Sequence, residues 1–120
     1  MTELVPALAS GRLAVRDLVA ALLARVDATD AGIHAWAHLD RDGALAQAAR
    51  LDALPAAQRG SVFGLPLGVK DIVDTADLPT QLGSPVGAGR RPERDARCIA
   101  RWRAAGGFVL GKTVTTEFAF

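Results

Sequence analysis

The stretch Gly64–Asp74, GLPLGVKDIVD, is the most informative part of the chain because it places one lysine inside an otherwise apolar, strand-like run. Strand formers occupy both faces of the run, as they do in buried central strands: Leu65, Leu67, Val69, Ile72 and Val73. A buried lysine must pair with an acid, reach solvent or lose its proton, because desolvation disfavours the charged form. Lys70 is therefore interpreted either as an ion-pair partner of Asp71 or Asp74, or as a base.

Two amphipathic helices and a short strand are predicted before this run. A first short helix is expected to be capped by Thr2 and to close at Gly11. Apolar residues then recur at helical spacing over residues 15–28, and Asp30–Gly32 is expected to end that helix. Residues 33–39 alternate between apolar and polar positions, which predicts a strand.

A further long helix follows, with Asp40 and Asp42 as alternative N-terminal caps and Pro55 as its stop. Beyond the central run, residues 78–92 are rich in Gly, Pro, Thr and Ser, and they predict a long loop that either carries function or lacks order.

Asp95 is predicted to cap a last helix, which Gly106 and Gly107 end and which buries Cys98, Ile99, Trp102 and Ala105. Residues 108–110 then form a short buried strand. The order strand, loop, helix, strand is that of a crossover between parallel strands.

Composition excludes several classes of function. The chain has 120 residues, half of them hydrophobic, and a net charge of +1, which indicates a soluble globular protein and gives no basic surface for nucleic acid. No apolar stretch is long enough to span a bilayer, and Met1 is followed by Thr2 and Glu3 instead of the basic region and apolar core of a signal peptide, so a cytoplasmic protein is expected. The single cysteine and the pair His34 and His38 lack ligand spacing, so neither a metal nor another cofactor is predicted.

The segment Gly106–Thr113 matches the spacing of a phosphate-binding loop, with Gly111-Lys112-Thr113 at its end. Its middle residues include Phe108, Val109 and Leu110, an apolar strand that cannot curl its amides around an anion. The match is interpreted as coincidental.

Several short blocks follow one another in order: Gly64–Asp71, Leu78–Thr80, Gly83–Pro85, Asp95 and Ala96, Arg101, Ala104–Gly106, Val109–Thr113 and Glu117–Ala119. Together they closely resemble the N-terminal part of the amidase signature family. The resemblance covers essentially the whole chain and is densest from Gly64 to Phe120.

The resemblance implies an α/β protein: the N-terminal part of the amidase-signature fold, with helices packed on a partial mixed β-sheet. It implies an incomplete amidase domain over residues 1–120, with a helical N-terminal region at 1–60 and the start of the core at 61–120. The implied partner is a small-molecule amide substrate, with neither nucleic acid nor membrane, and a homodimer is considered for the full-length protein.

The implied reaction is hydrolysis of a carboxamide C–N bond by a Ser/cis-Ser/Lys triad, a variant of the serine triad. In this family the lysine of the Gly-[Val/Ile/Ala]-Lys-Asp segment is the base, and Lys70 holds the matching position. The segment after Glu117 borders the substrate cleft in the family, so Ala119 and Phe120 are expected to line it. The alternative is that Phe118 and Phe120 are ordinary core residues.

Both triad serines and the oxyanion-hole glycines of the family lie farther along the chain than Phe120. Only Ser10, Ser61 and Ser84 are present here, none of them in a glycine-flanked nucleophile context. The chain is therefore expected to be inactive alone, because loss of an oxyanion hole costs about a hundredfold or more in rate. It is also expected to leave sheet edges and apolar faces uncovered.

Two other functions are kept as alternatives. One is a truncated or degenerate, non-catalytic module that acts through partner contacts. The other is the transamidating subunit that amidates aminoacyl-tRNA, which is disfavoured because Gln81–Ser84 stands where that subunit usually carries Cys-Ala-Ser. Val114, where many members have Asn, leaves the substrate open.

Overall fold

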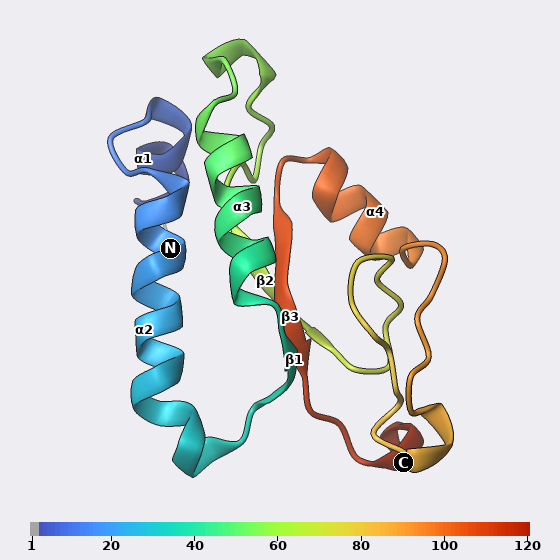
Figure 1. Ribbon diagram of the computed structural model, residues 1–120. Coiled ribbons are helices and arrows are strands. Elements are labelled where there is room, and N and C mark those ends of the chain that lie inside the picture. The colour runs from blue at the N-terminus through green and yellow to red at the C-terminus, as the bar shows by residue number, and fades with distance from the viewer. Residues whose placement is uncertain (1–2) are drawn as a thin grey trace.

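The computed structural model of the protein describes residues 3–120 (Figure 1). Its helices and strands are, in chain order, α1 (Leu4–Ser10), α2 (Val15–Ile33), β1 (Trp36–Leu39), α3 (Arg41–Asp52), β2 (Pro66–Lys70), α4 (Arg97–Ala104) and β3 (Phe108–Thr113). Short 3-10 turns lie at Ala56–Gln58, Pro85–Gly87 and Glu117–Ala119. Gly11 closes α1 with a φ of 76°, as predicted, whereas Thr2 lies outside the described residues.

The three strands form one mixed sheet in the order β1-β3-β2. β2 runs parallel to β3, as the strand, loop, helix, strand order predicts, and β1 runs antiparallel to β3. The central strand is β3 and not β2, so the prediction that the lysine-bearing run is a central strand is wrong for this chain. β3 is buried from Phe108 to Lys112 because it has a neighbour on each side, whereas β2 has one free edge.

Helices cover the sheet unequally (Figure 1). The face toward α2 and α3 holds the larger core cluster, formed by Leu8, Val15, Val19, Leu23, Ala44, Ala48, Phe63, Phe108 and Leu110. The other face lies under α4 and the loop that precedes it, and its cluster is Val69, Leu78, Ile99 and Val109. The small alanines of α3 let that helix approach the sheet closely, as the narrow apolar stripe predicts.

A β-bulge in β3 reorients the end of that strand. Leu67 lies opposite Val109 but Gly68 lies opposite Gly111, so Leu110 is the extra residue. Beyond a one-residue bulge, side chains exchange faces. Lys112 consequently points to the face covered by α4 and the loop, together with its register partner Val69.

Three details of the helices differ from the sequence prediction. α2 continues to Ile33 because Asp30–Gly32 does not break it; His34, with a φ of 55°, turns the chain instead. Asp95 does not cap α4, since its carboxylate accepts from the Ala76 amide and the Arg103 side chain. Cys98 is exposed and is not a core residue.

The cap of α3 is Asp40, whose carboxylate accepts a hydrogen bond of 2.9 Å from the Gly43 amide. Replacing Asp40 with alanine is expected to lower the free energy of unfolding by about 1 kcal/mol. Replacing Asp42, which lies in the first turn, should cost only about 0.3 kcal/mol through the helix dipole. Urea denaturation of the full-length protein measures both losses, and equal losses would contradict the capping role.

None of the helices within residues 3–120 is long and apolar enough to cross a membrane.

Candidate functional site

The carboxyl ends of β2 and β3 lie side by side, because the strands are parallel and Lys70 is the register partner of Thr113. The segments that leave these two ends, residues 71–84 and 114–120, meet beyond the sheet. They are joined by a hydrogen bond of 2.8 Å from the Phe118 amide to the Leu82 carbonyl. Loops at the carboxyl ends of parallel strands are where α/β proteins place their ligand sites.

Lys70 is exposed at the end of β2, so the prediction that it is buried is wrong for this chain. Along β2 it shares a face with Gly68, whose α-carbon lies beside the Trp36 ring and the Thr113 side chain. Among the described residues, the ammonium group of Lys70 has no hydrogen bond or ion pair.

The ion pairs proposed for Lys70 are also wrong, since both candidate carboxylates have other partners. Asp74 binds Arg90 through two hydrogen bonds, of 2.7 and 2.9 Å, at the surface. This contact lowers the pKa of Asp74. Asp71 is buried and its carboxylate lies 3.5 Å from Lys112 Nζ.

The buried lysine of the protein is Lys112, whose side chain is 0% exposed. Its Nζ donates to the carbonyls of Val73 (2.9 Å) and Pro79 (3.2 Å) and to Thr80 Oγ1 (2.5 Å). These three acceptors use all three ammonium hydrogens. Burial lowers the pKa of Lys112, and the negative charge of Asp71 opposes that shift.

The sequence motif around Lys112 points only to a phosphate-binding loop and not to a buried lysine. The strand β3 that carries it confirms that Gly106–Thr113 does not curl around an anion. The signal for its burial was present, since Phe108–Leu110 is as apolar as the run before Lys70. The apolar pattern does not predict the β-bulge at Leu110, which turns the Lys112 side chain beneath the 71–84 loop.

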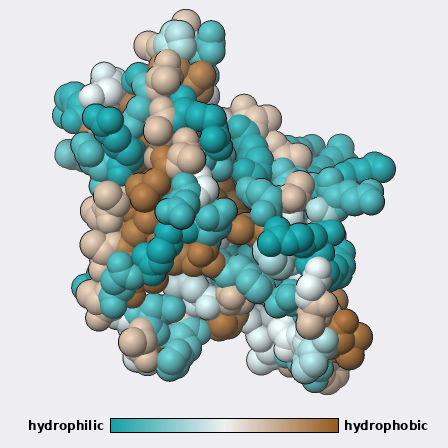
Figure 2. Space-filling view, in the orientation of Figure 1, coloured by the Kyte–Doolittle hydropathy of each residue, from teal (hydrophilic) through white to brown (hydrophobic). Residues whose placement is uncertain are grey.

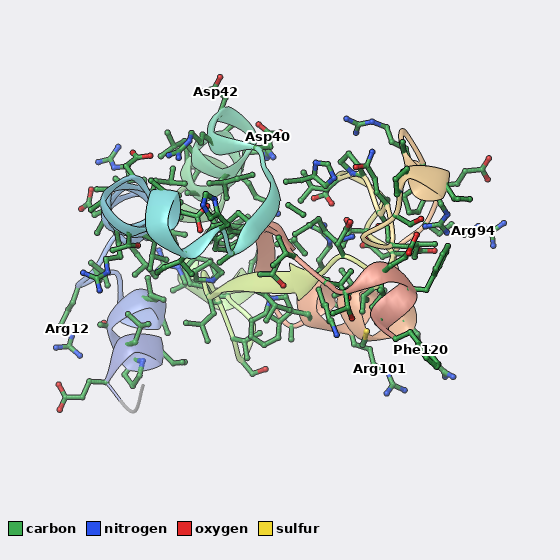
Figure 3. All side chains as sticks on the ribbon, turned by 90° about the horizontal axis from the view of Figure 1, so that it is seen from below. Arg12, Asp40, Asp42, Arg94, Arg101 and Phe120 are labelled. Carbon is green, nitrogen blue, oxygen red and sulfur yellow. The ribbon has the colours of Figure 1, made fainter. Side chains whose placement is uncertain are left out.

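Ala119 and Phe120 are exposed at the end of the segment that follows β3. A hydrogen bond of 2.6 Å from Ser84 Oγ to Glu117 fastens this segment to the 71–84 loop. Phe118 is 54% exposed and Phe120 fully exposed, so their interpretation as core residues is wrong for this chain. Figure 3 shows Phe120 at the periphery of the molecule, pointing away from the sheet.

Hydrophobic surface gathers at the lower right of Figure 2, where the C-terminal segment lies in Figure 1. The large exposed hydrophobic residues of this part of the chain are Val86, Val114, Phe118 and Phe120. Large exposed apolar patches are typical of surfaces that bind another segment or molecule. These four residues lie in loops and 3-10 turns and not on the faces of α-helices, so they do not test the expectation of uncovered helix faces.

One of the two histidines contacts the 71–84 loop. His34 is exposed, and His38 shares a hydrogen bond of 3.0 Å with the Gln81 side chain. Among residues 3–120, no group of three or more His, Cys, Asp or Glu side chains is arranged to hold a metal ion.

Residues 17–120 match the family described as Amidase. A glutamyl-tRNA(Gln) amidotransferase subunit from Salinispora arenicola is 41% identical over 119 residues, covering 98% of this chain and 24% of the relative.

Solved structures of amidases share the fold. The peptide amidase of Stenotrophomonas maltophilia superposes with a TM-score of 0.84 at 35% identity, covering 94% of this chain and 24% of that structure. An inhibitor-bound complex, described as revealing the origins of an s-triazine catabolic enzyme, gives a TM-score of 0.90 at 32% identity, covering 99% and 27%. The α/β fold predicted from the sequence is confirmed, and the chain spans about a quarter of the length of the proteins it matches.

Proposed function

Because the chain belongs to the amidase family, we propose that it is the N-terminal portion of an enzyme that hydrolyses a carboxamide C–N bond, with Lys70 as the base of a Ser/cis-Ser/Lys triad. The observation that carries the proposal is the position of Lys70. It ends a strand of the amidase fold, and its ammonium group has no partner within residues 3–120. A carboxylate partner would favour the charged form of the lysine, and the charged form cannot accept a proton.

In the proposed reaction, neutral Lys70 accepts a proton from a bridging serine, which accepts one from the nucleophilic serine. The nucleophile's oxygen then bonds to the amide carbonyl carbon. Breaking the C–N bond releases ammonia or an amine, which takes up the transferred proton, and leaves an acyl-enzyme ester. Water hydrolyses this ester and restores the serine.

The two serines of the triad are proposed to come from a part of the protein outside these 120 residues. Ser84 donates to Glu117, and Ser10 donates to the carbonyl of Ala7, one turn back in its own helix. Ser61 is an exposed residue of the turn before β2. Without a nucleophile, residues 1–120 alone would be inactive.

The exposure of Lys70 also supports the proposal that the lysine lies within these 120 residues and the two serines outside them. A lysine works as a base only in its neutral form, and desolvation favours that form. The corner of the sheet beside Lys70 is open, and β2 has a free edge. The remainder of the domain would cover this corner and bring the serines to it.

The transamidating subunit is the second candidate, because the Salinispora relative at 41% identity is named as a glutamyl-tRNA(Gln) amidotransferase component. In this case the enzyme would take ammonia from a carboxamide and pass it to glutamyl-tRNA with partner subunits. The departure at Gln81–Ser84 favours the stand-alone amidase. Ammonia release by the full-length protein alone supports hydrolysis without partners, and release only on addition of partner subunits supports transamidation.

A fluorophosphonate, which forms a stable bond with activated serines, tests whether the nucleophilic serine lies outside residues 1–120. In the full-length protein we expect a single labelled serine outside residues 1–120, with loss of ammonia release from primary carboxamides. Peptide mass spectrometry locates the label. Labelling of Ser84 or Ser61 would overturn the proposal, and the matched control is heat-unfolded protein, which should not be labelled.

A further inference from the structure

The chain turns sharply at Lys70. The Lys70 carbonyl accepts hydrogen bonds from the amides of Ile72 (2.8 Å) and Val73 (2.9 Å), and the Asp71 amide donates to the Thr113 carbonyl at 2.9 Å. The conformation of the backbone at Lys70 therefore depends on how the next three residues are held. A change in this turn would redirect the Lys70 side chain.

Lys112 ties this turn to the returning leg of the loop. It binds the Val73 carbonyl on the outgoing leg and the Pro79 carbonyl and Thr80 hydroxyl on the returning leg. The Asp71 carboxylate, 3.5 Å from Lys112 Nζ, also accepts from the Gln81 amide at 3.2 Å. One ammonium group thus links both legs of the loop that starts at Lys70.

A buried ion pair is a weak means of stabilisation, because the cost of removing two charges from water offsets their attraction. An apolar side chain of similar length would fill the same space without that cost. What the ammonium adds is geometry, since its hydrogen bonds fix the positions of three acceptors that apolar contacts would leave free to shift.

We infer that Lys112, together with Asp71, is a positioning residue that fixes the turn after β2 and thereby the direction in which Lys70 leaves the sheet. The inference rests on the proposed function of Lys70. Lys112 itself, enclosed beneath the loop, touches neither the substrate nor the reacting atoms.

The test compares Lys112→Met and Arg90→Met in the full-length protein. Arg90 ties the same loop from its exposed side, through Asp74 and the Thr80 carbonyl, and serves as the matched control. For Lys112→Met we expect kcat per folded molecule to fall about tenfold or more, with KM within about twofold, because small misplacements of a catalytic group are costly. Arg90→Met should stay within about twofold in both constants.

Hydrogen exchange followed by mass spectrometry gives a readout that does not depend on catalysis. Peptides within residues 71–84 should exchange faster in Lys112→Met than in the wild type or in Arg90→Met. If Lys112→Met does not fold, Thr80→Val carries the test, with an expected loss in kcat of about threefold. It removes the hydroxyl that accepts from Lys112 at 2.5 Å and that donates to the Val73 carbonyl at 3.5 Å.

An unchanged kcat per folded molecule, or unchanged exchange in residues 71–84, would overturn the inference, because a merely structural role alters only the folded fraction. The variant Lys70→Ala distinguishes failure of the positioning role of Lys112 from failure of the proposed role of Lys70 as the base. An inactive Lys70→Ala with normal Lys112→Met refutes the positioning role alone, whereas an active Lys70→Ala refutes the base.

Discussion

Replacing Lys70 with alanine in the full-length protein is expected to reduce amide hydrolysis by at least about 10³-fold, as removal of a triad member does in other serine hydrolases. The fold should be unaffected, because Lys70 is exposed and its ammonium group has no hydrogen bond or ion pair within residues 3–120. Ammonia release measures the activity, and urea denaturation measures the stability.

Lys70→Arg separates a base from a positive charge. The guanidinium group remains protonated and cannot accept a proton, so this variant should be as inactive as Lys70→Ala. Arg25→Ala, on the exposed face of α2, is the matched control and should retain activity. Activity in Lys70→Arg would show that Lys70 acts through its charge, and activity in Lys70→Ala would remove it from the mechanism.

Replacing Asp71 with alanine is expected to lower the free energy of unfolding by about 3 kcal/mol or more, because it leaves the buried ammonium of Lys112 without its counter-charge. The same change removes the acceptor of the Gln81 amide. Asp71 is 2% exposed and Lys112 is 0% exposed, so bulk water does not screen the charge that is left unpaired. The midpoint of urea denaturation measures the loss.

Asp74→Ala is the matched control for this prediction. It breaks a shorter ion pair, of 2.7 Å, between Asp74 and Arg90, but at the surface, where such pairs contribute only about 0–1 kcal/mol. A loss for Asp71→Ala no greater than that for Asp74→Ala would mean that the Lys112 ammonium does not depend on its carboxylate.

Local patterns predicted most of the fold correctly. Helical spacing located the helices, and apolar runs located β2 and β3 with their parallel connection. These predictions succeed because helix and strand periodicity depends on residues close in sequence. The predicted cap of α4 failed because it depends on residues outside the first turn of the helix: the Asp95 carboxylate accepts from Ala76 and Arg103 instead.

In the candidate site, too, some features follow from local sequence and others only from tertiary contacts. The family and the choice of Lys70 followed from the order of residues alone, because the motif around that lysine is a contiguous string. Which of the two lysines is buried became clear from the three-dimensional arrangement. A bulge at Leu110 turns Lys112 beneath the loop, and the edge position of β2 leaves Lys70 open. Burial depends on strand order and on which loop covers which face, and neither is encoded within a short stretch of sequence.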